Sequence, residues 1–202
     1  MEIIATYSFN KGKECIEKTH KKELEELETI ISSVDAMQCK TKKSEEKTMK
    51  GKMLYSPRAM NRLFKKTLKD SGWTVGKRIY LKTTVPEIGE THEGYREIDA
   101  VKNNLGVEIQ FGKYAFMVYN VAAKMTIFSK HGVIDSGIEI VPMGTLQKEM
   151  STGVSTFQQI KTDLECRGVS NIDIPVLVLG IDYIKRPNQN FSLRKWVKEK
   201  KK

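Results

Sequence analysis

The sequence predicts an α/β fold in which a central mixed β-sheet is flanked by helices. Residues 13–34 place apolar side chains at a helical period, whereas residues 97–111 contain two short β-like runs separated by Asn103-Asn104. Residues 175–181 form a continuous apolar run, PVLVLGI, which is typical of a strand buried on both faces. The chain of 202 residues is long enough for a single domain with a sizeable core.

The first quarter of the chain is expected to hold a strand, a helix and a loop. Residues 2–9 alternate loosely and predict a short strand. Residues 13–34 predict one amphipathic helix that covers the sheet, because Glu and Lys fill the face opposite to its apolar side chains. Residues 40–52 lack apolar periodicity and contain six basic and two acidic residues. They predict a solvated polar loop, with contact to a DNA backbone as the alternative.

The middle and the end of the chain supply the remaining elements. Ser56-Pro57 is a good helix start, with Ser as N-cap, for a helix that ends near Lys69 before Gly72. The Asn103-Asn104 pair tolerates positive φ, so residues 97–102 and 105–111 predict a hairpin. The other expected elements are a β-rich run at 77–84, a strand at 133–143, a short helix at 146–150, a turn at 151–155 and a helix at 157–166.

Residues 115–128, AFMVYNVAAKMTIF, predict a helix that is apolar nearly all round. Such a helix must be buried on more than one side. One side can face its own sheet, and the other can face a second subunit. The sequence therefore favours a homodimer.

The chain carries 35 Lys and Arg residues against 25 Asp and Glu residues, a formal net charge of +10. This excess indicates a polyanionic partner, either nucleic acid or an anionic membrane surface. Residues 185–202 hold eight basic residues and one acidic residue, so most of the excess lies in a basic C-terminal tail. The rest of the chain is nearly neutral, and the organisation we expect is one domain over residues 1–202 that ends in this tail.

Several function classes are excluded by missing motifs. No apolar run approaches 18 residues and the N-terminus does not look like a signal peptide, so we expect a cytoplasmic protein that does not span a membrane. The three cysteines are far apart and indicate reduced thiols, without a zinc finger or a disulfide framework. A Walker loop, a GxGxxG segment and an HExxH motif are absent, which argues against nucleotide hydrolysis, dinucleotide chemistry and a zincin.

The predicted hairpin carries the residues that suit chemistry. A turn at Asn103-Asn104 brings Asp99 and Glu108 across from one another, and Gln110 projects from the same face as Glu108. Two such carboxylates suit a hard cation, above all Mg²⁺, and the Ile109 carbonyl is a further candidate ligand. A metal there lowers the pKa of bound water and neutralises charge on a phosphate. The alternative is a solvated hairpin face without a metal.

Asp99, Glu108 and Gln110 resemble the site of the PD-(D/E)XK nuclease superfamily, in the form that carries Gln where Lys usually stands. The segment VEIQFGKY is similar to one in the group of type II restriction endonucleases that includes BstYI and BglII, with the likeness to BstYI the more extensive. The chain departs from the broader superfamily at Ile98, where many members have Pro. The BamHI-like arrangement, with an acid in place of Gln110, is a poorer match. Ordered matches extend along most of the chain, at residues 31–36, 40–42, 46–48, 54–57, 107–114, 137–140, 148–151 and 175–180.

The resemblance implies a homodimeric type II restriction endonuclease that uses Mg²⁺ and cuts double-stranded DNA. Its target would be a palindrome with a GATC core, RGATCY, cut before the G to leave four-base 5′ overhangs. Asp99 and Glu108 would ligate the metal, and Gln110 would orient the attacking water or the scissile phosphate. Because Gln carries no charge, the metal would supply more of the transition-state stabilisation. A cognate DNA methyltransferase would protect the host's own sites.

Four further residues are candidates for DNA contact. Lys113 follows the catalytic strand and can reach guanine acceptors in the major groove, or it is a surface lysine at a helix start. Ser151, Thr152 and Ser155 lie in the turn STGVS, where the resemblance implies a recognition loop; the alternative is a simple turn. Thr152 stands where BstYI has Ser, which leaves tolerance at the outer base pair open.

Two other functions fit the same residues. A structure-specific nuclease of the superfamily, such as a junction resolvase, would cut branched DNA without sequence preference. A non-catalytic DNA-binding protein with this fold would shift specific DNA in a gel without cleaving it.

Overall fold

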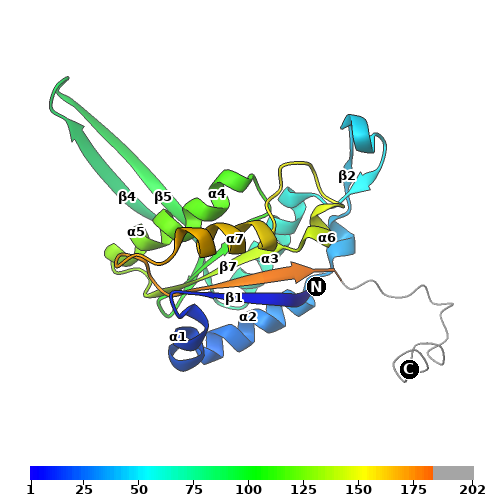
Figure 1. The fold of residues 1–202 in the computed structure, drawn as a ribbon, viewed down its shortest axis with the longest axis horizontal. Coiled ribbons are helices and arrows are strands. Elements are labelled where there is room, and N and C mark those ends of the chain that lie inside the picture. The colour runs from blue at the N-terminus through cyan, green and yellow to red at the C-terminus, as the bar shows by residue number, and fades with distance from the viewer. Residues whose placement is uncertain (184–202) are drawn as a thin grey trace.

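The computed structural model describes residues 1–183 and is built on a six-stranded mixed sheet (Figure 1). The predicted basic tail at 185–202 lies outside the described residues. The β1–β8, β6–β5 and β5–β4 pairs are antiparallel, whereas β8–β7 and β7–β6 are parallel. The predicted fold class is confirmed. In sheet order the strands are β1 (Glu2–Phe9), β8 (Val176–Asp182), β7 (Ser136–Pro142), β6 (Leu105–Ile109), β5 (Glu90–Lys102) and β4 (Thr74–Val85).

Helices cover both faces of the sheet and bury a separate apolar cluster on each face. On one face, side chains of α1 (Gly12–Thr19), α2 (Lys21–Ser33) and α3 (Pro57–Asp70) pack against β6, β7 and β8. On the other face the cluster contains residues of α7 (Phe157–Arg167) and of the helical segment 114–130. The central strands are therefore buried on both faces, as the continuous apolar run at 175–181 predicts. No helix within residues 1–183 is long and apolar enough to cross a membrane.

The single helix predicted over residues 13–34 is wrong, because the chain breaks at His20 into α1 and α2. His20 has φ −132° and ψ 32°, outside the helical region. Its ring is buried, and Nε2 lies 2.7 Å from Asp135 Oδ1. His20 falls on the apolar face of the predicted helix, so the helical period of the sequence continues through the residue at which the structure breaks. The α3 helix starts as predicted, since the Ser56 hydroxyl accepts a hydrogen bond from the Ala59 amide at 3.3 Å.

Residues 40–52 are more ordered than the loop that the sequence predicts. After the 3₁₀ turn η1 (Ala36–Cys39), β2 (Lys42–Lys43) pairs with β3 (Met53–Leu54), and η2 (Lys47–Met49) closes the small lobe between them. Backbone bonds hold this lobe, and apolar periodicity therefore gives no sign of it. Figure 1 shows the lobe and the β4–β5 hairpin at opposite ends of the molecule.

The β4–β5 hairpin is much longer than the strands predicted at 77–84 and 97–102. Its outer part projects beyond the sheet, and Figure 1 shows it standing clear of the helices. Most side chains of this outer part are exposed on both faces, so no polar–apolar alternation marks it in the sequence. The β5–β6 hairpin turns as predicted, with φ 46° at Asn103 and 65° at Asn104.

The helix predicted at 115–128 forms as a continuous helical segment with an irregular centre. It consists of α4 (Tyr114–Tyr119), the π-helical turn η3 (Asn120–Lys124) and α5 (Met125–Lys130). Beyond β7, the short helix α6 (Gly144–Gln147) lies slightly earlier than its predicted position at 146–150. The predicted helix at 157–166 matches α7, which a reciprocal capping box between Thr156 and Gln159 starts.

Candidate active site

The site lies where β5 and β6 stop pairing. Their ladder ends at Ala100–Val107, so the next backbone groups of β6 need other partners. The Asp99 carboxylate supplies one, because its Oδ2 accepts a hydrogen bond from the Ile109 amide at 2.9 Å. This bond ties Asp99 to the strand that carries Glu108. The predicted meeting of Asp99 with the β6 acid is therefore present in the structure.

Glu108 is a buried acid on the central strand β6. Burial raises the pKa of Glu108 to about 8, and the nearby charge of Asp99 adds to the rise. Lys124 opposes it, with Nζ 2.7 Å from Glu108 Oε1. A carboxylate in this position is desolvated and close to another anion, an arrangement that favours binding of a cation.

Gln110 follows directly after β6, and its side chain is held by hydrogen bonds at both ends. Its Nε2 donates to the Lys113 carbonyl at 3.1 Å, and its Oε1 accepts from Asn120 Nδ2 at 3.5 Å. The amide is thus oriented beside the acids by the start of α4 and by the π-helical turn.

These side chains share one open pocket with a volume of about 350 Å³. Asp99, Glu108, Ile109 and Gln110 all line it, and so does Lys124. The four residues that the sequence singles out for catalysis and metal binding are therefore brought together.

The sequence reasoning missed two lysines and a third acid. Lys65 on α3 places Nζ 2.7 Å from Asp99 Oδ1, and it makes a longer contact with Glu97. Glu139 on β7 pairs in register with Glu108, is fully buried and accepts a bond from Asn120 Nδ2 at 3.1 Å. Burial raises the pKa of Glu139 well above its usual range, and the charge of Glu108 adds to this effect.

The donor set fits a magnesium ion better than a softer metal. Asp99, Glu108 and the Ile109 carbonyl offer only oxygen, and Mg²⁺ in proteins uses one or two carboxylates and keeps several waters. Within residues 1–183, no group of three or more His, Cys, Asp or Glu side chains is arranged to hold a metal. Each of the two acids also lies 2.7 Å from an ammonium nitrogen, so both already attract positive charge.

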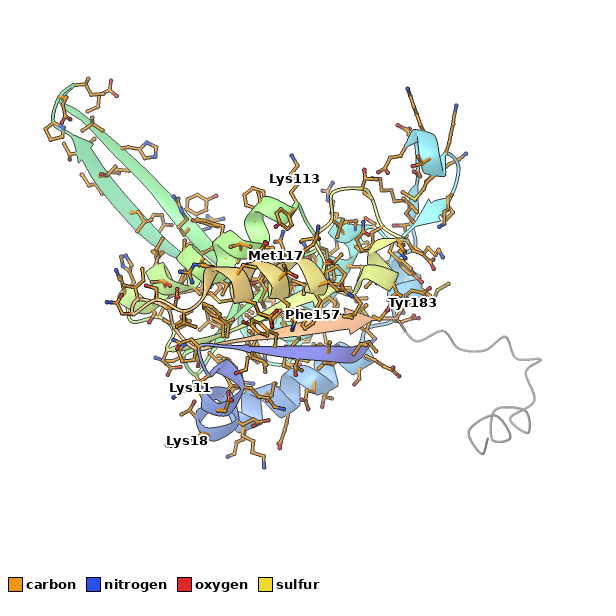
Figure 2. The ribbon with its side chains drawn as sticks, in the orientation of Figure 1. Lys11, Lys18, Lys113, Met117, Phe157 and Tyr183 are labelled. Carbon is orange, nitrogen blue, oxygen red and sulfur yellow. The ribbon has the colours of Figure 1, made fainter. Side chains whose placement is uncertain are left out.

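The candidate DNA-reading residues lie in two segments that the structure joins beside the pocket. Lys113 forms an isolated β-bridge with Val154, and the Tyr114 amide donates to the Gly153 carbonyl at 3.3 Å. Lys113 is exposed, and Figure 2 shows its side chain pointing away from the body, on the side to which the β4–β5 hairpin also extends. The turn at 151–155 is thereby attached to the segment that directly follows β6, the strand that carries Glu108.

The three candidate side chains of this turn differ in how exposed they are to solvent. Thr152 is exposed and Ser151 is half-buried, so both are accessible. Ser155 is fully buried, and its hydroxyl donates to the Gly112 carbonyl at 3.4 Å. Direct DNA contact by Ser155 is the part of the prediction that this structure does not support, because the side chain holds the turn against residue 112.

The β2–β3 lobe supports the turn from the other side. Lys42 Nζ donates to the Ser151 hydroxyl, and the Thr152 amide donates to Glu46 at 3.2 Å. Residues 40–52, predicted as a solvated loop, therefore hold the predicted recognition turn in position through hydrogen bonds to residues 151 and 152.

The family model and the solved structures that match this chain belong to the same group of proteins. The family model described as restriction endonuclease BglII/BglIII matches residues 4–181. The crystal structure of restriction endonuclease BglII with a DNA 16-mer superposes with a TM-score of 0.71 and 18% identity, over 93% of this chain and 81% of that one. Free BglII gives a TM-score of 0.61 and 17% identity, over 93% and 82% of the two chains. No curated protein matches the sequence.

Proposed function

Because the chain belongs to the BglII/BglIII restriction endonuclease family, we propose that it makes Mg²⁺-dependent double-strand cuts at a GATC-core palindrome. The expected site is RGATCY, cut before the G to leave four-base 5′ overhangs. The family makes the chain a type II restriction endonuclease, and therefore a site-specific deoxyribonuclease. The closer likeness to BstYI, on which the outer base pairs depend, stays a prediction.

The observation that carries the proposal is the shared pocket of Asp99, Glu108 and Gln110 at the point where β5 and β6 separate. Asp99, Glu108 and the Ile109 carbonyl are the proposed ligands of Mg²⁺. When bound, the metal supplies an activated water and neutralises charge on the scissile phosphate. The Gln110 amide, held by Lys113 and Asn120, orients that water or the phosphate through hydrogen bonds.

Lys113, Ser151 and Thr152 are the proposed DNA contacts, with Ser155 as a positioning residue. The BglII structure that superposes on this chain holds DNA, which supports binding of duplex DNA here. A palindromic site requires two-fold symmetry, so we propose a homodimer. Tyr114 and Phe116 on α4 are exposed aromatic side chains and support the predicted second contact of this helix. A cytoplasmic single-domain enzyme with a partner DNA methyltransferase completes the proposal.

The test is digestion of a sequenced plasmid with Mg²⁺, followed by sequencing of the ends. Discrete fragments with GATC 5′ overhangs are expected. Asp99→Asn and Glu108→Gln should each reduce cleavage at least about 10³-fold while leaving specific binding in Ca²⁺ largely intact, because each replaces a charged proposed metal ligand with a neutral amide. Glu25→Gln, which removes an exposed carboxylate from α2, serves as the matched control.

Three outcomes would contradict the proposal. Absence of fragments at GATC sites would reject the sequence specificity. Cleavage of branched substrates without sequence preference would indicate a structure-specific nuclease. A specific gel shift without cleavage in any divalent metal would indicate a DNA-binding protein that retains the fold.

A further inference from the structure

Hydrolysis of a phosphodiester places negative charge on the non-bridging oxygens, and preorganised positive groups stabilise it. The PD-(D/E)XK pattern normally supplies a lysine two residues after its second acid. In this chain Gln110 occupies that position and carries no charge. β6 therefore supplies no cation to the pocket, and among its lining residues the cations are Lys124 and Arg96, whose guanidinium donates to Tyr119 and to the Tyr95 carbonyl.

We propose that Lys124 is a catalytic residue whose ammonium group contacts the scissile phosphate and supplies the positive charge that Gln110 lacks. The inference rests on the proposed nuclease function and adds to it a residue from a different element. Lys124 lies at the end of the π-helical turn, far from the strand motif along the chain, yet it lines the same pocket as Asp99, Glu108 and Gln110.

The local structure directs Lys124 inward. Its side chain is only 14% exposed, although lysine side chains usually remain in solvent. Asn120 and Lys124 stand four residues apart, and both meet acids of the sheet, Asn120 at Glu139 and Lys124 at Glu108. π-helical turns inside α-helices are rare, and those that occur are often found at functional sites. Lys130, the last residue of α5, is exposed.

The ammonium of Lys124 has donors to spare. It carries three N–H groups. Among residues 1–183, Glu108 is the only ion-pair partner found for Lys124 Nζ. Two donors therefore remain for a phosphate oxygen while the third keeps the group oriented by Glu108.

Lys65 does not fit this role, although it is equally close to an acid. It approaches Asp99 and Glu97 from α3 and does not line the pocket. Lys124 is thus the lysine that faces the space where the reacting phosphate must lie.

The test compares Lys124→Gln, Lys124→Arg and the matched control Lys130→Gln. Single-turnover cleavage with Mg²⁺ gives the chemical rate, and binding of the cognate duplex in Ca²⁺ is measured across a series of salt concentrations. Lys124→Gln should slow cleavage about 10²–10³-fold, the size of effect found when one transition-state donor is removed. It should also make the slope of log K against log salt shallower by about 0.9 for each phosphate that the protein no longer neutralises.

Lys124→Arg keeps the charge and should retain the wild-type salt slope, with cleavage within about tenfold of wild type. Lys130→Gln should match the wild type in both assays. Cleavage by Lys124→Gln within about twofold of wild type would overturn the proposal. A slow Lys124→Gln with an unchanged salt slope, and with Lys124→Arg equally slow, would also overturn it, because Lys124 would then only support Glu108. A wild-type protein that fails to cleave would instead reject the proposed function itself.

Discussion

Replacement of Lys65 by Gln tests whether neighbouring lysines offset the negative charges of the two pocket acids, Asp99 and Glu108. Lys65 Nζ lies 2.7 Å from Asp99 Oδ1, and the two side chains are 33% and 18% exposed. Although burial opposes it, the hydrogen bond to Asp99 raises the pKa of Lys65 above its usual value. A hydrogen bond between charged groups in such a half-buried place contributes about 2 kcal/mol to the free energy of unfolding.

Without added metal, Lys65→Gln should therefore lower the melting temperature by about 4–8 °C, since a chain of this size loses about 2–4 °C for each kcal/mol. The matched control is Lys66→Gln. The Lys66 side chain is 72% exposed, and within residues 1–183 the ion pair found for it is with Asp70. That variant should lose under about 0.5 kcal/mol.

Mg²⁺ should reverse most of the loss in Lys65→Gln, because the metal then neutralises the acids that the lysine no longer balances. A recovery of about 1.4 kcal/mol corresponds, by linkage, to Mg²⁺ binding about tenfold more tightly to the variant than to the wild type. Scanning calorimetry with and without Mg²⁺ measures the first quantity, and isothermal titration without DNA measures the second. An equal loss of stability at zero and saturating Mg²⁺ would refute the reasoning.

Two further predictions concern the predicted recognition turn and the stability of the fold at low pH. Lys42→Ala removes the bond to the Ser151 hydroxyl and should weaken binding of the cognate duplex about tenfold; Lys43→Ala, an exposed neighbour, should bind normally in the same gel shift. Although burial alone would raise the pKa of Asp173, its bonds with Arg167 lower it below the usual value. This pair should therefore stabilise the fold at pH 7 and lose that effect below about pH 4. Urea unfolding of Asp173→Asn should show a deficit at pH 7 that shrinks towards pH 3, and a deficit constant with pH would contradict it.

The sequence predicted the parts of the fold that rest on local patterns. The capped start of α3, the Asn103-Asn104 turn and the buried strand β8 follow from side-chain types at fixed offsets. The break at His20 could not be predicted, because it depends on Asp135, a residue distant in the chain. The long β4–β5 hairpin also escaped, since a strand exposed on both faces has no burial period.

The same division applies to the candidate site. Asp99, Glu108 and Gln110 were predictable because one hairpin and a strand period of two place them together. Lys65 and Lys124 reach the two acids from two helical segments, and only tertiary packing brings them there. One signal was present in the sequence, since Asn120 and Lys124 are polar residues four apart in a run that is otherwise almost wholly apolar.

The pairing of each acid with a lysine resolves an electrostatic conflict in the site. On the proposed function the pocket must receive a phosphate, yet it is lined by carboxylates. Two like charges about 4 Å apart repel by about 4 kcal/mol near a protein surface. Lys65 and Lys124 oppose this repulsion at Asp99 and Glu108 before any metal is present. The basic tail contributes +7 of the formal +10, so the rest of the chain has little general charge with which to offset the acids. Local pairing therefore lowers the repulsion that a DNA phosphate would meet at this acidic site. The variants that change an acid should cleave poorly because they alter a proposed metal ligand, while still binding DNA.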